Sequence, residues 1–301
     1  MTAEITIIIT CFNEEKYLSA CLNSIIQQTF IHWDVLIIDD GSTDDSVAIA
    51  QSFADKDSRI SIVANEINQG HYASINKALN LTESSYFTRV DADDTLHPSY
   101  LARCYHMISN NTGLGAVFVN FKYFDQQGES SSNYPIEVSD KTFGIADILE
   151  EGSLQYQGSF FEDSLTNYFR GIGLMRTALV KEFGGFEEWR SEADLLMYLK
   201  LASKTKIHCI NQALYNYRRH EDSATAKIFH EKEDLIWKKN LLLCANKFFL
   251  QNGLLETNGF QKQKKSIIRE YYRHCINRSR KSLKFHLALF YAAKLVLNIL
   301  R

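Results

Sequence analysis

Short apolar runs alternate with amphipathic segments over the first 120 residues, and this alternation constrains the fold more than any other feature. Runs rich in β-branched and aromatic residues occur at residues 5–10, 34–39, 59–64, 86–91 and 114–124. Between them, apolar residues recur at helical spacing over residues 14–28, 43–54, 70–81 and 98–109. Strands that alternate with such helices imply βαβ crossovers. The pattern predicts an α/β fold, with a Rossmann-like, mostly parallel sheet flanked by helices.

The alternation ends after residue 120, where the segments differ in kind. The sequence predicts a turn and a short helix that end at the Gly184-Gly185 pair, and an amphipathic helix over residues 191–203. The runs KIHCIN (206–211) and ALYNYRRH (213–220) are interpreted as a pair of strands. After Ser223 the chain is expected to be helical.

Polar residues gather directly after three of the predicted strands, at residues 13–15, 39–45 and 91–94. In parallel sheets, ligands bind at the carboxyl ends of the strands. The three clusters are therefore expected to meet at one edge of the sheet and to form a binding site there.

The third cluster lies in the segment RVDADD (89–94), which places three carboxylates, Asp91, Asp93 and Asp94, within four positions. One interpretation is a loop whose aspartates only cap the following helix. The other is a site for a hard divalent cation, which takes oxygen ligands and relieves the repulsion between them. Mg²⁺ keeps some water and takes substrate phosphate oxygens as further ligands. A metal that holds a nucleotide diphosphate would explain the cluster.

Two common phosphate-binding motifs do not occur. The sequence has no G-x-x-x-x-G-K-[ST], which excludes a P-loop, and no G-x-G-x-x-G after the first predicted strand. Phosphate would then be bound by metal and side chains. Nucleic acid is not an expected partner, because the body of the chain is acidic. Residues 260–301 carry eleven Lys or Arg against Glu270, a charge of +10, so residues 1–259 carry −13 of the total of −3.

The cysteine usage and the first residues bear on the compartment. Six cysteines are scattered with no C-x-x-C pair, which favours free thiols in a reducing cytoplasm and argues against a zinc or disulfide framework. The first residues, MTAEITIIITCFNEE, lack the features of a signal peptide. The expected location is cytoplasmic.

Four segments in order, ITIIITCFNEEKYLSACLNSIIQQTF, DVLIIDDGSTDDS, NQGHYASINKAL and RVDADD, together resemble the family 2 inverting glycosyltransferases, which have the GT-A fold. The resemblance continues through GFEEWRSEADLLMYLKL and LYNYRRHEDSAT and covers roughly residues 3–225. It implies a GT-A domain over residues 1–225, with a nucleotide-sugar half (1–120) and an acceptor half (121–225). Residues 226–301 would form a helical, basic and amphipathic C-terminal region.

The resemblance also implies a set of nucleotide-sugar-binding residues. Glu15 would lie near the ribose or base, Asp40 would accept a hydrogen bond from a base N–H, and Asp91 would bind the ribose or the metal region. The full set is Thr10, Phe12, Asn13, Glu15, Asp40, Asn68, Gly70, Asn76, Lys77 and Asp91. From the residues alone, the segments 39–42 and 68–70 are also adequate turns.

The resemblance assigns the metal to Asp93 as a direct ligand, with Asp94 either nearby or capping the next helix. His220, in YRRHEDS (217–223), would be a third metal or diphosphate ligand, although a lone histidine is more often structural. Arg218 or Arg219 would counter phosphate charge. An all-oxygen site accepts Mg²⁺ or Mn²⁺, and the sequence does not choose between them.

An inverting transfer is one in-line displacement, so a base must take the proton from the acceptor hydroxyl. A carboxylate in hydrogen-bond reach typically contributes a factor of ~10²–10⁴. The family pattern is Glu-Asp at a helix start, and it places Asp194 at the Asp, with Ala193 where Glu is usual. This departure makes Glu192 an alternative base. Both acids could instead only stabilise the helix N-terminus. Arg170 and Arg176 are interpreted as solvated or structural.

The segment SLKFHLALFYAAKLVLNIL (282–300) is apolar on most faces and follows the basic NRSRKSLK. Lys294 inside it would cost roughly 2.5–3.5 kcal/mol near the centre of a membrane span. A helix in the membrane interface fits better, which would attach the protein peripherally to the inner face of the cell membrane. The alternative is a terminal helix packed on protein.

The first hypothesis is thus a metal-dependent inverting glycosyltransferase that moves a sugar from a nucleotide-diphosphate donor, a UDP-sugar by family analogy, to a glycan or lipid-linked acceptor in surface polysaccharide assembly. A sugar nucleotidyltransferase would usually show a glycine- and arginine-rich loop after the first strand, where this chain has TCFNEEK. A non-catalytic nucleotide-sugar-binding relative is the third hypothesis, raised by Ala193.

Overall fold

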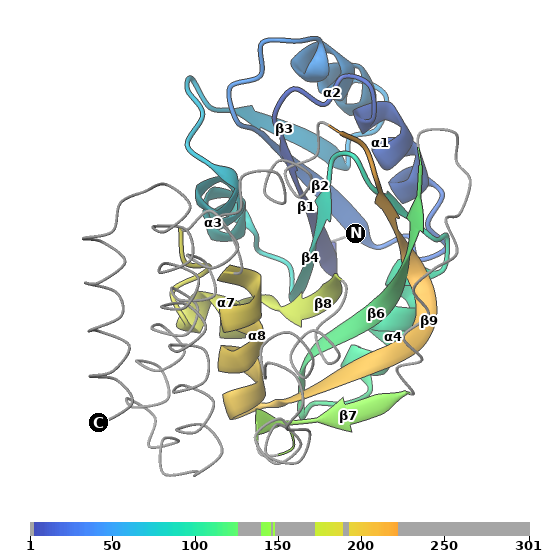
Figure 1. Cartoon of the computed structure of the whole chain (residues 1–301), viewed down its shortest axis with the longest axis vertical. Helices are drawn as coiled ribbons and strands as arrows, with labels where there is room; N and C mark the ends of the chain where they lie inside the picture. The colour runs from blue at the N-terminus through green and yellow to red at the C-terminus, as the bar shows by residue number, and fades with distance from the viewer. Residues whose placement is uncertain (1–2, 126–139, 146, 148–171, 189–192, 222–301) are drawn as a thin grey trace, which may run out of the picture. The chain divides into compact units, whose positions relative to one another are not determined.

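The computed structural model describes residues 3–125, 140–145, 147, 172–188 and 193–221 (Figure 1). Nearly all of them belong to one compact unit, Met1–Ile145 with Asn167–His220, and a second unit comprises Ala146–Thr166 with Glu221–Arg301. The described strands of the first unit form a single nine-stranded sheet. The predicted C-terminal region, 226–301, lies outside the described residues. No helix among the described ranges is long and apolar enough to cross a membrane.

Four parallel strands form the first half of the sheet, as predicted. They are β1 (Ile5–Cys11), β2 (Trp33–Asp39), β3 (Ile60–Ala64) and β4 (Tyr86–Asp91), in the order β3-β2-β1-β4. The connecting helices are α1 (Leu18–Ile26), α2 (Ser46–Ala54) and α3 (His71–Leu81), and α4 (Tyr100–Ser109) follows β4. Each helix lies inside its predicted range. The β-branched runs form central strands because both faces of the sheet are covered.

Alternate residues of each strand face opposite layers of helices. Ile5, Ile7 and Ile9 of β1 belong to the core cluster that also contains the buried residues of α1 and α4. Ile8 is equally buried but points to the other face, where α3 contacts β1 and β2. On that face the ring of Tyr198, from α8 (Ala193–Lys204), contacts the ring of Phe118 at 4.4 Å between centroids. The sheet is thus the middle of three layers.

The second half of the sheet is mixed. It contains β5 (Thr95–Leu96), β6 (Leu114–Phe124), β7 (Lys141–Phe143), β8 (Gly173–Arg176) and β9 (Lys206–Arg218). The order continues β4-β8-β6-β9-β5, with β8 antiparallel to both of its neighbours and β6 parallel to β9. The predicted α/β fold class is confirmed. β6 runs through residue 120, so the two predicted halves of the domain share one strand.

The predicted strand pair at residues 206–211 and 213–220 is wrong, because both runs belong to the single strand β9. Val119 pairs with Ile210 and Asn120 with Ala213, so the intervening Asn211 forms part of a bulge rather than a turn. The Asn211 side chain accepts a 2.7 Å hydrogen bond from Asn120, and its backbone N–H donates to Asp140. Residues 173–176 (GLMR) lie in the segment 169–189, which was expected to contain only a turn and a short helix, and instead form β8.

The turn before α8 is fixed to α3 by one side chain. The helix α7 (Thr177–Glu182) ends at the predicted Gly184-Gly185 pair, and both glycines have positive φ. The Asn76 side chain of α3 donates to the Phe186 carbonyl at 2.7 Å and accepts from the Phe186 N–H at 2.8 Å. A Cβ on Gly185 would lie 2.5 Å from Asn76 Oδ1. Only glycine therefore allows this approach of the two segments.

We expect Gly185→Ala to lower the free energy of unfolding by about 1–2 kcal/mol for the left-handed backbone. A further ~1–3 kcal/mol is expected for overpacking against Asn76. Urea unfolding followed by circular dichroism measures the sum. The matched control is Gly184→Ala, which has the same backbone conformation (φ +82°) but open space at its Cβ. Equal losses in the two variants would show that the contact with Asn76 does not constrain the turn.

Candidate active site

The three polar clusters meet at one edge of the sheet, as predicted. Thr10 at the end of β1 pairs in register with Ile38 of β2 and with Asp91 of β4, and Cys11 pairs with Asp39. Because residues paired in register point to the same side of a sheet, Thr10 and Asp91 both face the layer of α3 and α8. This face, beyond the ends of β1, β2 and β4, is the candidate active site.

The loop after β1 is bonded to the loop after β2 by reciprocal hydrogen bonds. Asn13 adopts a left-handed backbone (φ 58°), which asparagine tolerates. Its N–H donates to Ser42 Oγ at 2.9 Å, and its side-chain oxygen accepts from the Thr43 N–H at 2.8 Å. Glu15 similarly accepts from the Asp45 N–H at 3.1 Å, just before α2. The side chains of Asn13 and Glu15 thus hold this rim together. Phe12, between them and β1, is 45% exposed.

Asp40 is a buried carboxylate that organises the loop before α3. It accepts hydrogen bonds from the Asn65 side chain (2.8 Å), the Gln69 N–H (2.9 Å) and the Gly70 N–H (2.8 Å). Burial alone would raise the pKa of Asp40, but these donors outweigh it and lower the pKa. Asp39 accepts from the N–H groups of Gly41 and Ser42, so the interpretation of this segment as a turn is correct at Asp39.

The other predicted donor-site residues near α3 lie around Asp40. Lys77 donates to the Asn65 side chain at 2.5 Å and is thereby linked to Asp40. Asn68 is exposed, and Gly70, with φ 99°, is the N-cap residue directly before α3. The side-chain amide of Asn76 instead forms hydrogen bonds with the Phe186 backbone, in the turn before α8.

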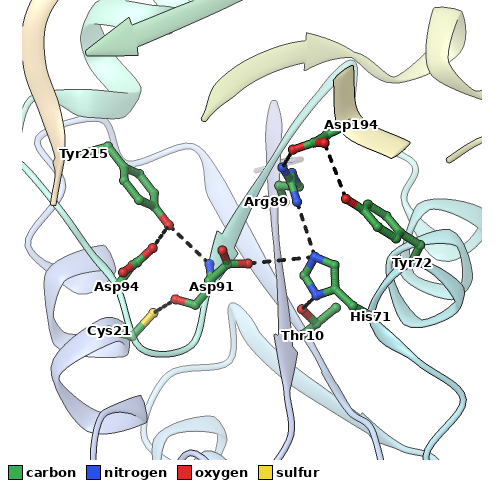
Figure 2. A network of polar contacts seen from close by, with 9 residues as sticks. All are labelled: Thr10, Cys21, His71, Tyr72, Arg89, Asp91, Asp94, Asp194 and Tyr215. Atoms are coloured by element: carbon green, nitrogen blue, oxygen red, sulfur yellow. Dashed lines mark hydrogen bonds and ion pairs between the residues drawn. The ribbon is translucent and has the colours of Figure 1, made fainter. Parts of the chain in front are cut away.

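A chain of polar contacts crosses the candidate site from β4 to α8 (Figure 2). His71, the first residue of α3, contacts Thr10 Oγ1 through Nδ1 at 2.9 Å and Arg89 through Nε2 at 3.3 Å. An arginine only donates, so Nε2 accepts and the His71 proton lies on Nδ1. Loss of solvation and the Arg89 charge lower the pKa of His71, against the opposing effect of Asp91, whose carboxylate lies 4.0 Å from Nε2. His71 is therefore neutral at physiological pH.

The predicted base lies at the other end of this chain. Arg89 Nη2 donates to Asp194 Oδ2 at 2.6 Å, and the Tyr72 hydroxyl lies 3.4 Å from Asp194 Oδ1. Burial raises the pKa of Tyr72 well above its usual value, so its hydroxyl stays protonated and donates. Asp194 is the second residue of α8 and its side chain is 29% exposed. Ala193 before it is buried, and the alternative base, Glu192, lies outside the described residues.

The predicted metal-ligating residues contact each other. His220 Nε2 lies 3.0 Å from Asp93 Oδ2, and the His220 ring rests against Tyr17, with 4.7 Å between centroids. Burial and the nearby Asp91 charge raise the pKa of Asp93, and His220 opposes this shift. Arg218 donates from Nε to the Asp93 carbonyl at 2.7 Å, so it positions the turn of the backbone.

Within the described ranges, no group of three or more His, Cys, Asp and Glu side chains is arranged to hold a metal. The pair Asp93 and His220 still fits a divalent ion that completes its shell with water and phosphate. Two neighbouring ligands of an octahedral ion with bonds of about 2.1 Å lie roughly 3 Å apart. Asp93 and His220 have this spacing.

Asp94 does not cap α4, contrary to one of the sequence-based interpretations. It is 1% exposed and accepts hydrogen bonds from the Tyr215 hydroxyl and, at 2.7 Å, from the Arg218 N–H. The Tyr215 oxygen also accepts from the Asp91 N–H at 3.4 Å (Figure 2). Burial and the Asp93 charge raise the pKa of Asp94 well above its usual value. Asp94 therefore fastens the DADD turn to β9.

Four residues of the site were not predicted from the sequence: Arg89, His71, Tyr72 and Tyr215. The position of Arg89 could have indicated a site residue, because a charged side chain inside an otherwise apolar strand requires a partner of opposite charge. His71 and Tyr72 follow the loop 65–70 directly, but nothing in their spacing identifies their partners. Arg176 is structural, as interpreted, and donates to the Leu114 carbonyl at 2.7 Å. Arg170 lies outside the described residues.

Solved structures share the fold. TarS (residues 1–349) of S. aureus, crystallised in complex with UDP-GlcNAc, superposes with a TM-score of 0.63 at 21% identity, covering 99% of this chain and 89% of that one. The mannosyltransferase PcManGT of Pyrobaculum calidifontis, in complex with GDP-Man and Mn²⁺, gives 0.61 at 13% identity, with 99% and 81% covered. Both likenesses show a glycosyltransferase fold of the GT-A type.

Sequence comparison identifies the family. The model of the family described as Glycosyl transferase family 2 matches residues 6–182. Glycosyltransferase GlyG of Streptococcus pneumoniae is 26% identical over 80% of this chain and 78% of its own length. Chondroitin synthase of Escherichia coli is 28% identical over 76% of this chain and 31% of its own length. The chain belongs to glycosyl transferase family 2, so it is a glycosyltransferase, and the resemblance seen in the sequence is confirmed.

We expect Asp94→Ala to lower the free energy of unfolding by about 2–3 kcal/mol, because it leaves the Tyr215 hydroxyl and the Arg218 N–H without their acceptor in the interior. Urea unfolding of the purified variant measures this loss. The control is Asp55→Ala on the exposed end of α2, which should change the free energy by less than ~0.5 kcal/mol. A loss at Asp94 no larger than at Asp55 would contradict the fastening role.

Proposed function

We propose that this glycosyltransferase moves a sugar from a UDP-sugar to a hydroxyl of a glycan or lipid-linked acceptor, with inversion at the anomeric carbon and with Mg²⁺ or Mn²⁺ bound. The UDP-GlcNAc complex of TarS supports the donor class. The Mn²⁺ complex of PcManGT supports the metal. Similarity to chondroitin synthase supports a role in polysaccharide assembly. We propose that the polysaccharide belongs to the cell surface.

One observation carries the proposal. The carboxylate proposed as base, Asp194, and the carboxylate proposed to bind the donor, Asp91, flank the same two side chains, Arg89 and His71. The proposed base and the proposed donor-binding end of β4 are thus linked by three contacts through two side chains on one face of the sheet. This arrangement suits a reaction in which the donor carbon and the acceptor hydroxyl meet there.

Asp194 acts as the general base. The acceptor oxygen bonds to the anomeric carbon while the bond from that carbon to the diphosphate oxygen breaks, and the hydroxyl proton passes to the Asp194 carboxylate. The diphosphate leaves with the electron pair of the broken bond. The rim formed by Asn13, Glu15 and Asp40 would hold the nucleoside during this step, with Phe12 exposed beside it.

Asp93 and His220 would hold the divalent ion, with Asp91 beside them. When bound, the ion supplies Lewis-acid stabilisation of the departing diphosphate. Arg219, which is exposed next to His220 and whose guanidinium lies 3.7 Å from the centroid of the Tyr123 ring, would counter phosphate charge. The apolar segment 282–300, with the basic run NRSRKSLK at its start, would bring the enzyme to the inner face of the membrane and so to a lipid-linked acceptor.

Purified protein should release UDP from at least one member of a panel of UDP-GlcNAc, UDP-glucose and UDP-galactose, in the presence of Mn²⁺. Asp194→Asn should lower the rate of release by ~10²–10⁴-fold and leave UDP binding intact, because only the base is lost. Glu188→Gln, at an exposed site on the turn before α8, is the control and should retain the rate. Full turnover by Asp194→Asn would transfer the role of base to Glu192, and no release from any donor would refute the UDP-sugar assignment.

Removal of metal tests the second part of the proposal. UDP should bind more weakly in EDTA than in Mn²⁺ by isothermal calorimetry, because the ion joins the diphosphate to Asp93. Asp93→Asn should remove this difference, whereas Asp55→Asn should keep it. Equal UDP affinity in EDTA and in Mn²⁺ would argue that the enzyme works without a metal.

A further inference from the structure

Arg89 is a buried cation in the centre of the sheet. Its side chain is 9% exposed, and it comes from β4, whose other residues before Asp91 are apolar or small and buried. Burial disfavours its charge, but Tyr198 and Asp194 outweigh this effect and raise the pKa of Arg89. Among the described residues, its Nε has no hydrogen-bond partner. A buried ion pair seldom stabilises a protein more than apolar side chains would, so stability alone does not account for Arg89.

The contact between Arg89 and Asp194 distinguishes the two carboxylate oxygens. Oδ2 accepts a charge-assisted hydrogen bond of 2.6 Å, whereas Oδ1 faces the Tyr72 hydroxyl at 3.4 Å. Charge-assisted bonds of this length are roughly twice as strong as neutral ones. Arg89 therefore holds the carboxylate through Oδ2, and Oδ1 is the oxygen on the side of the Tyr72 hydroxyl.

Arg89 also joins the base to the donor side of the site. Arg89 and Asp91 are two residues apart on one strand, so they point to the same face. β4 is a central strand bonded to β1 and β8, which makes it a rigid support. α8, which carries Asp194, is bonded to this strand by the ion pair between Arg89 and Asp194. Arg89 thus links the Asp194 carboxylate directly to the strand that ends in Asp91 (Figure 2).

We propose that Arg89 is a positioning residue for the base: it holds Asp194 Oδ2 and orients Oδ1, beside the Tyr72 hydroxyl, toward the acceptor hydroxyl. This inference rests on the proposed function, in which Asp194 takes the acceptor proton. The proton moves from the acceptor oxygen to Oδ1, and Arg89 keeps its own protons throughout.

A double-mutant cycle tests the assignment, with the UDP-sugar that gives the fastest UDP release as donor. Arg89→Met should lower kcat by ~10²-fold, the usual cost of a misplaced catalytic group, and leave the affinity for UDP with Mn²⁺ unchanged. Arg89→Lys keeps the charge without the planar fork and should retain more of kcat than Arg89→Met. Because Arg89 acts only through Asp194, the double variant Arg89→Met with Asp194→Asn should be no slower than Asp194→Asn alone.

The control for a merely structural role is Arg176→Met, which removes another arginine that bonds within the sheet region. It should lower the melting temperature without changing kcat of the folded fraction. If Asp194→Asn is inactive but the losses at Arg89 and Asp194 multiply, the positioning role is overturned and the proposed function stands. If Arg89→Met weakens UDP binding at unchanged kcat, Arg89 serves the donor instead. If Asp194→Asn retains the full rate of UDP release, both the assignment of Asp194 as the base and the positioning role of Arg89 are refuted.

Discussion

Four carboxylates crowd the carboxyl edge of one sheet, and the rest of the site is arranged around their repulsion. The charged form of Asp40 is stabilised by hydrogen bonds from N–H groups of the loop before α3. Asp94 is buried against Tyr215 and the backbone of β9. Asp91 and Asp93 remain, and burial together with the Asp91 charge raises the pKa of Asp93. Asp40 and Asp94 are thus held by hydrogen bonds within the protein. The negative charge of Asp91 and Asp93 would be balanced by a divalent cation, which would in turn bind a diphosphate.

β4 connects the two kinds of chemistry in this enzyme. Its last residue, Asp91, is proposed to bind the donor, and Arg89 two positions earlier bonds the proposed base on α8. His71 lies between them, and its lowered pKa favours the neutral form. It therefore contacts both side chains without adding a positive charge. Because a central strand does not shift without breaking its ladders, β4 holds Arg89 and Asp91 at a fixed separation.

The first half of the fold could be predicted from the sequence, because each βαβ unit is encoded locally by its own periodicity. The site could be predicted as far as the carboxyl ends of the strands, where Thr10, Asp40 and Asp91 were expected to converge. The partners could not. Arg89 and Asp194 are 105 positions apart, and Asp94 and Tyr215 are 121 apart, so no local pattern relates them. β9 was divided in two because Asn211, at its bulge, resembles a turn residue when its partners Asn120 and Asp140 are not known.

The bonded rim between the loops after β1 and β2 has a consequence for recognition. Asn13 and Glu15 are already hydrogen-bonded to residues 42–45 of the loop after β2. The side chains of this rim are therefore ordered before a nucleoside binds. Association then requires little ordering of this rim. The affinity for the nucleotide moiety would therefore reside mainly in preorganised contacts, and discrimination between sugars would fall to residues elsewhere in the chain.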